Sequence, residues 1–222
     1  MDSFIVNSII AIAEKYSNVL KVWLFGSRAR GDNHEKSDYD IAILAPMLSE
    51  KDKLGFLEDL ENIETFHKID VVFVRESNKE LNENIERDGI LLMDKFHIKL
   101  KNFSSALERL KEAVFENEKN QNTVLRDGAI QRFEFTAELS WKTTREYLLT
   151  LQINDINNPK AVMAEAYNNN LIDNEEKWLQ ILKDRNSTSH IYDEETADEI
   201  YSRIKNSHID AFDSLVEVLG KK

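Results

Sequence analysis

Hydrophobic and polar residues follow two different rhythms along the chain. Within residues 1–96, short apolar runs alternate with helix-like patterns. The runs at residues 19–25 and 67–74 are rich in β-branched and aromatic side chains, and a third segment with alternating apolar residues begins at Tyr39. Such runs are typical of strands. Strands separated by helical patterns predict a mixed sheet packed against helices.

Helical patterns fill the intervals between these strands. Ser49 and Asp52 resemble a capping box, which predicts a helix start, and a short helix is expected around Leu81 and Ile85. Residues 90–93 predict a small edge strand. The chain also opens with an amphipathic helix, in which apolar residues recur at helical spacing: Ile5, Ile9, Ile12, Ala13 and Tyr16.

From Phe96 onward the pattern becomes purely helical. Apolar residues step along the chain with the period of a bundle helix: Phe96, Leu100, Phe103, Leu107, Leu110 and Val114. A second long stripe follows: Ile130, Phe133, Ala137, Trp141, Thr144 and Leu148. Asn158 and Pro159 predict the cap and first residue of a short helix, and a helix around Trp178 comes next. The last helix carries Ile200, Ile204, Phe212, Leu215 and Leu219.

These patterns together predict an α+β protein with two domains. A mixed-sheet domain is expected over residues 1–96, and an all-α, up-and-down bundle of four to five helices over residues 97–222. No linker rich in proline, glycine or serine separates the two, so the boundary is predicted from the change of rhythm alone.

Composition narrows the class of protein without naming a function. Hydrophobic residues make up 41% and charged residues 32% of the 222 residues, as in ordinary soluble globular proteins. The absence of cysteine excludes disulfides and thiol nucleophiles, and no apolar run reaches the length of a membrane span, so a cytoplasmic protein without membrane partners is expected. The net charge of −12 argues against general nucleic-acid binding, so any contact with RNA has to be local.

The first candidate for chemistry is the turn that ends the first predicted strand. Gly26 allows a phosphate to approach the backbone closely, and Ser27 offers a hydroxyl and an N–H. Asp38 and Asp40 lie two residues apart at the head of the next strand, which places both carboxylates on one face. Two carboxylates beside a phosphate predict a magnesium site for phosphoryl transfer.

A third carboxylate opens the following strand. If the strand that carries Asp70 pairs beside the strand that starts at Tyr39, Asp70 reaches the same end of the sheet as Asp38 and Asp40. Asp70 then either completes the metal shell or accepts the proton of an incoming hydroxyl.

This arrangement resembles the minimal nucleotidyltransferases of the DNA polymerase β superfamily. The resemblance rests on Gly26-Ser27, the Asp38-x-Asp40 pair and Asp70, and the stretch from Arg28 to Gly31 and residues 85–92 match the extended signature. It implies that Asp38, Asp40 and Asp70 are catalytic and bind Mg²⁺. It also implies that ATP is bound with the help of Gly26, Ser27, Arg28 and Arg30.

A second candidate lies in the helical half. Arg185 and His190 flank a Ser-Thr-Ser stretch that favours a helix end. In an unbroken helix they would diverge by about 140°, but a break between them allows them to converge. An arginine that holds a phosphate and a histidine that exchanges a proton suffice for metal-free RNA cleavage through the ribose 2′-hydroxyl. The alternative is an ordinary capping arrangement at a helix end.

Arg185, His190 and Tyr192 resemble the Arg-x4-His-x-Tyr motif of HEPN domains, particularly those encoded beside minimal nucleotidyltransferases as toxin–antitoxin pairs. Residues 133–135 and Trp141-Lys142 resemble the branch described as nucleotidyltransferase substrate-binding proteins. The resemblance implies a HEPN-like bundle that dimerises, with Arg185 and His190 as ribonuclease residues. It further implies that Tyr192 accepts AMP, which silences the ribonuclease, although here both partners lie on one chain.

Three functional hypotheses therefore remain at this point. The first is a single-chain toxin–antitoxin protein that transfers AMP from ATP to Tyr192 of its own chain or of a homodimer mate. The second is a small-molecule nucleotidyltransferase, such as an aminoglycoside-modifying enzyme, whose bundle shapes the substrate pocket. The third is a non-catalytic regulatory module that binds metal without turnover.

The remaining basic side chains are expected mainly on the surface, with an RNA or nucleotide groove as the alternative for the arginines and the lysine among them. His34, His67 and His208 lack the spacing of metal ligands and are expected on the surface. A set of basic residues is interspersed with acids, which predicts a mainly solvated face: Arg126, Arg132, Lys142 and Arg145.

Overall fold

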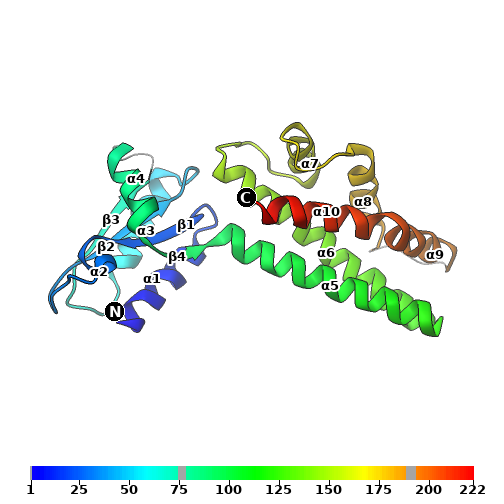
Figure 1. The fold of residues 1–222 in the computed structure, drawn as a ribbon, viewed down its shortest axis with the longest axis horizontal. Coiled ribbons are helices and arrows are strands. Elements are labelled where there is room, and N and C mark those ends of the chain that lie inside the picture. Colours follow the sequence, from blue (N-terminus) through cyan, green and yellow to red (C-terminus); the bar gives the residue numbers. More distant parts are fainter. Residues whose placement is uncertain (1, 75–78, 189–193) are drawn as a thin grey trace. The chain divides into compact units, whose positions relative to one another are not determined.

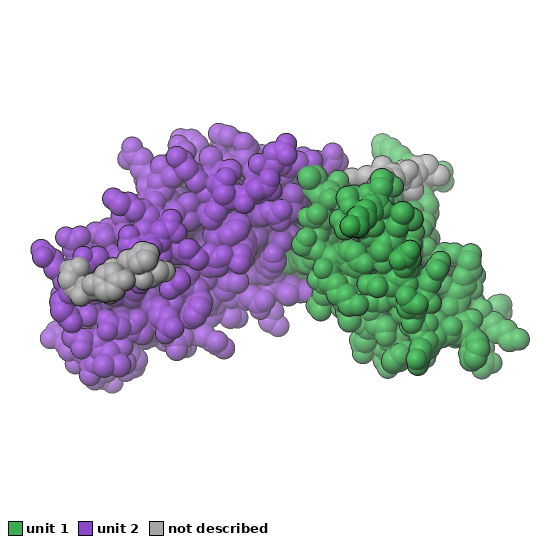
Figure 2. Space-filling model, turned by 180° about the vertical axis from the view of Figure 1, so that it is seen from behind, with its two compact units in different colours: residues 1–95 green, residues 96–222 purple. Residues whose placement is uncertain are grey.

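The computed structural model describes residues 2–74, 79–188 and 194–222, and it divides into two compact units, Met1–Lys95 and Phe96–Lys222 (Figure 2). The predicted boundary between residues 96 and 97 lies one residue from this division. Each unit has its own hydrophobic core.

Unit 1 is built around a four-stranded mixed sheet, as the sequence predicted (Figure 1). The strand order is β3-β2-β1-β4; β1 pairs antiparallel with β2 and β4, whereas β2 and β3 are parallel. The elements are α1 (Ser3–Lys15), β1 (Lys21–Phe25), α2 (Gly26–Arg30), β2 (Tyr39–Leu44), α3 (Glu50–Glu61), β3 (Ile69–Phe73), α4 (Lys79–Asp88) and β4 (Ile90–Asp94).

Helices α1 and α3 contribute to one core with the sheet. The side chain of Asp2 caps α1 by accepting a hydrogen bond from the N–H of Phe4, and the helix then buries Ile5 and Ile9. At the contact between the two helices the rings of Tyr16 and Phe56 meet edge to face, with centroids 5.3 Å apart. This packing fixes the sheet that carries the acidic residues.

The predicted start of α3 is confirmed, but only one of the two hydrogen bonds of a capping box is formed. Ser49 accepts a hydrogen bond from the N–H of Asp52 at 3.1 Å. The Asp52 carboxylate does not reach back to the backbone of the cap residue; it accepts from the Ser49 hydroxyl at 2.7 Å.

Unit 2 is mostly helical, which confirms the α+β class. Its elements are α5 (Lys95–Asn120), α6 (Thr123–Thr150), α7 (Pro159–Asn168), α8 (Glu175–Ser187), α9 (Glu194–Arg203), the π-helical turn η2 (Ile204–His208) and α10 (Ile209–Gly220). Asn158 caps α7 and Pro159 is its first residue, as predicted. No helix in the described part of the chain is both long and apolar enough to cross a membrane.

The single last helix expected from the sequence is interrupted by η2. Within this turn the N–H of Ile209 donates to the carbonyl of Ile204, five residues back, before α10 resumes the α-helical pattern. The three segments nevertheless follow one another without a break, and the red and orange ribbon in Figure 1 shows their course.

Two expectations about surface residues are wrong. His208 is buried, with 1% of its surface exposed, because its ring stacks on Phe133 and its Nε2 lies 2.8 Å from the Asp184 carboxylate. Arg126, expected on a solvated face, is 6% exposed because Glu194 and neighbouring acids surround its guanidinium. In both cases an acid far away in sequence takes part, Asp184 for His208 and Glu194 for Arg126, so the local pattern gave no sign of burial.

Candidate active site

Asp40 and Asp70 lie directly opposite each other on neighbouring parallel strands. The register pairs Asp40 of β2 with Asp70 of β3, and on its other side pairs Asp40 with Phe25, the last residue of β1. Residues opposite each other in adjacent strands project to the same face of a sheet. The two carboxylates therefore share a face beside the turn that begins at Gly26.

Gly26 packs against the Asp40 carboxylate. Its φ of +70° lies in the left-handed region, and a Cβ added there would fall 2.0 Å from Asp40 Oδ2. From the sequence, a glycine was expected here because it lets a phosphate approach the backbone closely. The structure gives it a further reason, because any side chain at position 26 would displace the carboxylate.

Electrostatics show that the acids are close enough to act on one another. Burial raises the pKa of Asp40, and the negative charges of Asp70 and Asp38 raise it further, whereas Arg30 and Lys68 oppose the shift. The Lys68 ammonium lies 2.6 Å from Asp70 Oδ1, and this ion pair raises the pKa of Lys68. The carboxylates repel one another more than the nearby cationic side chains offset, and a bound cation would reduce this repulsion.

The donor set fits a hard divalent cation by its chemistry. Aspartate oxygens are the ligands that Mg²⁺ prefers, and Asp40 and Asp70 offer them on one face with Asp38 nearby. Among the residues that the structure describes, no three side chains of His, Cys, Asp or Glu already form a metal-binding group. Asp70 is turned to Lys68, so cation binding would have to displace that ammonium.

Arg28 acts as a brace within the unit. Its Nη2 donates to the carbonyl of Ser37 at 2.6 Å, its Nε donates to the carbonyl of Asp38 at 3.1 Å, and its guanidinium lies 3.9 Å from the centre of the Tyr39 ring. Nη2 also lies 3.2 Å from Nδ1 of His67, which is half-buried. Arg28 therefore holds the segment that leads into Asp38 and Asp40.

Gly26, Arg30 and α4 border a cavity of about 360 Å³. The Arg30 side chain is largely exposed and pairs with Asp32 at 3.3 Å, while the Ser27 carbonyl accepts the N–H of Gly31. The cavity is lined by Phe25, Gly26, Arg30, Leu81, Asn84, Ile85, Arg87, Asp88 and Gly89. Asn84 and Arg87 were not predicted as site residues; Arg87 lies within residues 85–92 of the extended signature, whereas Asn84 precedes that stretch and gave no signal.

The second candidate site is described only in part. Arg185 lies on the last turn of α8, where its Nη2 pairs with Oε2 of Glu138 at 3.0 Å and its Nη1 donates to Asn186 at 3.2 Å. Its Nε is buried without a hydrogen-bond partner among the described residues. His190 and Tyr192 lie outside the described residues, so their expected convergence with Arg185 stays a prediction.

Glu138 is a partner that sequence reasoning missed. It projects from α6, accepts a hydrogen bond from Trp141 Nε1 at 3.1 Å and pairs with Lys142 at 2.8 Å. Burial alone would raise the pKa of Glu138, but the bonds from Lys142 and Trp141 and the charge of Arg185 hold it below its usual value. An anionic Glu138 thus fixes Arg185 against α6.

The residue before Arg185 is anchored from inside the bundle. Asp184 is 2% exposed and accepts bonds from Arg203 Nε at 2.8 Å and from Gln180 at 2.8 Å, in addition to its contact with His208. This network connects the end of α8 to α9 and η2. It fixes the backbone from which Arg185 projects.

Both halves of the chain match known families. Residues 98–221 match the family described as nucleotidyltransferase substrate binding protein like, and residues 7–97 match the polymerase β nucleotidyltransferase family. The first match covers more than half of the chain.

Individual relatives match part of the chain. A protein named probable ribonuclease HepT, from Haemophilus influenzae, is 40% identical over 88 residues, which are 38% of this chain and 60% of that protein, so the chain spans less than two thirds of this relative. A solved Haemophilus influenzae structure, described as the fold of a substrate binding domain of a nucleotidyltransferase, is 31% identical, with a TM-score of 0.50, over 55% of this chain and 98% of its own. A crystal structure of a Thermus thermophilus protein is 33% identical, with a TM-score of 0.47, over 54% of this chain and 97% of its own.

Proposed function

This chain belongs to the nucleotidyltransferase substrate binding protein like family and carries a polymerase β nucleotidyltransferase domain, and from this premise we propose that it transfers AMP from Mg-ATP to a hydroxyl group. The observation that carries the proposal is the pairing of Asp40 with Asp70 beside Gly26. The proposed acceptor is Tyr192 of the same chain or of a dimer mate.

Each candidate site residue of unit 1 has a role in the proposed transfer. Asp38, Asp40 and Asp70 hold Mg²⁺, which when bound offsets the negative charge of the phosphates and of the acids. Gly26 and Ser27 place backbone next to the triphosphate, and Arg28 keeps the segment before Asp38 in position. The cavity of about 360 Å³ beside Gly26 receives the nucleoside.

The transfer is a displacement at the α-phosphorus. The Tyr192 oxygen forms a bond to this phosphorus, and the bond to the bridging oxygen breaks, so that pyrophosphate leaves with that oxygen. Asp70 accepts the phenolic proton as the new bond forms. The product is an AMP phosphodiester on the tyrosine.

AMP on Tyr192 would silence the proposed ribonuclease site of the helical half through its charge and its size. Arg185 and His190 form the proposed ribonuclease site, and a relative of this half is named a probable ribonuclease. AMP on Tyr192, two residues from His190, adds negative charge where RNA phosphates bind, so repulsion and steric occlusion silence the site together. We place this site at a homodimer formed through the helical half.

A second candidate function is favoured by the family description itself. A substrate-binding bundle fits a small-molecule nucleotidyltransferase, in which unit 2 holds the acceptor and Tyr192 is not modified. The two candidates share the chemistry of unit 1 and differ in the acceptor.

The test is the intact mass of the purified chain after incubation with Mg-ATP, alongside Asp40→Asn and Tyr192→Phe. The first proposal expects AMP increments on the wild-type chain and none on either variant. Consumption of ATP only after addition of a small molecule supports the second candidate. Metal binding without consumption of nucleotide in any mixture contradicts both and leaves a regulatory module.

A further inference from the structure

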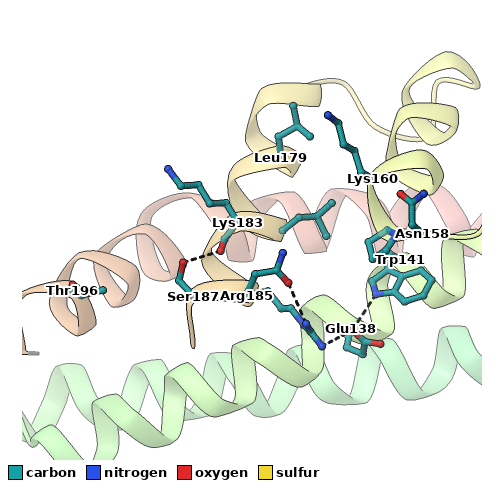
Figure 3. Close-up of a pocket in the computed structure, with 12 residues that line it drawn as sticks. Glu138, Trp141, Asn158, Lys160, Leu179, Lys183, Arg185, Ser187 and Thr196 are labelled. Carbon is teal, nitrogen blue, oxygen red and sulfur yellow. Dashed lines mark hydrogen bonds and ion pairs between the residues drawn. The ribbon is translucent and has the colours of Figure 1, made fainter. Parts of the chain in front are cut away.

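A second cavity lies within unit 2, between α6, α7 and α8 (Figure 3). Its volume is about 670 Å³, within the range of small-molecule sites. Arg185 forms part of its wall, yet most of the lining plays no role in the proposed transfer or cleavage. It is lined by Glu138, Trp141, Asn158, Pro159, Lys160, Leu179, Leu182, Lys183, Arg185, Asn186, Ser187 and Thr196.

Part of the lining of this cavity is basic. Lys160 of α7 and Lys183 of α8 are exposed, and neither forms an ion pair with a described residue. Among the described lining residues Glu138 is the only acid, and it is already engaged by Arg185, Trp141 and Lys142. In a chain with a net charge of −12, the lining of this cavity holds three cationic side chains, of which Arg185 is paired with the one acid and Lys160 and Lys183 are left over.

Much of the remaining lining is apolar. Trp141 is half-buried, and the bond from its Nε1 to Glu138 holds the plane of the indole. Leu182 and Pro159 continue the apolar wall, and Leu179 is 37% exposed at its margin. In Figure 3 the indole of Trp141 lies close to Glu138, and Arg185 reaches toward the same carboxylate from α8.

We infer that this cavity binds a nucleoside monophosphate unit. A base stacks on Trp141, as bases do on aromatic side chains, and its phosphate is bound by Lys160, Lys183 and Arg185.

A nucleoside monophosphate unit can reach this cavity from two sources. One is a nucleotide of an RNA strand that passes Arg185; the other is the AMP carried by Tyr192. Binding in the cavity does not require AMP transfer, and only the second source rests on the proposed function.

The binding test uses the full chain with AMP, and with inorganic phosphate, in buffer containing EDTA, measured by isothermal titration calorimetry. We expect one AMP per chain. Lys160→Gln combined with Lys183→Gln should weaken AMP binding about tenfold or more, because two charge-assisted contacts are lost. Trp141→Leu should weaken it about tenfold through the loss of stacking, whereas Trp141→Phe should keep most of the affinity.

The controls separate this site from others. Lys177→Gln removes a charge from α8 outside the cavity and should leave AMP binding unchanged. Inorganic phosphate should bind more weakly than AMP and should not respond to Trp141→Leu. No AMP binding, or binding that ignores the lysine and tryptophan variants, overturns the inference. Since no transfer occurs without Mg²⁺ and ATP, this failure is distinct from failure of the proposed function.

Two further arms assign the source. Displacement of AMP by a short single-stranded oligoribonucleotide, lost in the double lysine variant, assigns the site to RNA. Loss of AMP binding after incubation with Mg-ATP in the wild-type chain, but not in Tyr192→Phe, assigns it to the attached AMP. If neither treatment affects AMP binding, the assignment to these two sources is wrong.

Discussion

His208 and Asp184, which lie 24 residues apart, meet in the core of unit 2 with Nε2 and Oδ2 at 2.8 Å. The contact is buried on both sides, and Arg203 contributes a cation to the same carboxylate. Since Arg185 follows Asp184 directly, this pair holds the end of α8 in place and leaves the Arg185 side chain free to engage Glu138. A buried polar network thus supports a residue of the candidate ribonuclease site.

Replacing Asp184 by asparagine should destabilise the protein in a pH-dependent way. Burial raises the pKa of Asp184, but the bonds from His208 and Arg203 outweigh it and hold the pKa below its usual value. The folded state therefore binds the proton less readily than the unfolded state, so the stabilisation is present above about pH 4 and is lost as the pH falls below it. We expect Asp184→Asn to cost about 3 kcal/mol at pH 7, measured by urea unfolding.

The matched control for this variant is Asp173→Asn, which removes an exposed carboxylate from the loop before α8. It should change the free energy of unfolding by less than about 0.5 kcal/mol. Equal losses in the two variants, or a gap for Asp184→Asn that does not narrow as the pH falls below about 4, would show that the ionised carboxylate does not stabilise the fold.

Gly26→Ala should abolish AMP transfer. The added Cβ would lie 2.0 Å from Asp40 Oδ2, at a backbone position with φ of +70°. Displacement of a reacting group by about 1 Å costs on the order of 100-fold in rate, and the strain should lower the free energy of unfolding by about 2–4 kcal/mol. Transfer is measured by release of pyrophosphate and stability by thermal melting.

Gly31→Ala is the comparison for this substitution. Gly31 has a similar φ of +81°, but nothing lies within 4 Å of the position of its Cβ. The variant should lose about 1 kcal/mol of stability and keep transfer nearly intact. A similar loss of transfer in both variants would mean that backbone strain, and not the position of Asp40, decides the activity.

Asp40→Asn should remove transfer and yet make the metal-free protein more stable. Burial, together with the charges of Asp70 and Asp38, raises the pKa of Asp40. The folded state then binds the proton more tightly than the unfolded state, so the wild-type chain loses stability as the pH rises through the acidic range. In EDTA at pH 7 we expect a melting temperature a few degrees above that of the wild type.

The pH and metal dependence provide the check on this variant. The gain should vanish below about pH 4, where the wild-type carboxyl is protonated. Addition of Mg²⁺ should raise the melting temperature of the wild-type chain and not that of the variant. A variant that is less stable than the wild type in EDTA at pH 7 would contradict the crowding of charge at this site.

Arg28→Lys should impair transfer although the charge is kept. A lysine cannot donate to the carbonyls of Ser37 and Asp38 in the same fork, nor stack as a plane on Tyr39. We expect a loss of about 1–2 kcal/mol in stability, faster hydrogen exchange in residues 31–38 and at least about tenfold slower transfer. Lys36→Gln, an exposed change in the same segment, should behave like the wild type. Wild-type rates of hydrogen exchange in residues 31–38 of Arg28→Lys would contradict the bracing role of Arg28.

The sequence predicted those parts of the molecule that follow from local period and from strand pairing. Alternation placed the carboxylates at strand ends, and once β2 and β3 pair in parallel, Asp40 and Asp70 fall opposite each other. Contacts of side chains with distant carbonyls have no such period. The bracing role of Arg28 and the pairing of Glu138 with Arg185 therefore appeared only in the structure.

The π-helical turn η2 explains how the C-terminal helix keeps one side toward the core. Ile200, Ile204, His208 and Phe212 follow one another at intervals of four residues, and all are buried. In a regular α-helix each such step overshoots a full circle by about 40°, so three steps would carry Phe212 about 120° around the axis. The wider turn absorbs this rotation. Deleting one residue from this turn would therefore restore an ideal helix and, by swinging every later side chain about 100°, would aim the wrong faces of α10 at the interior.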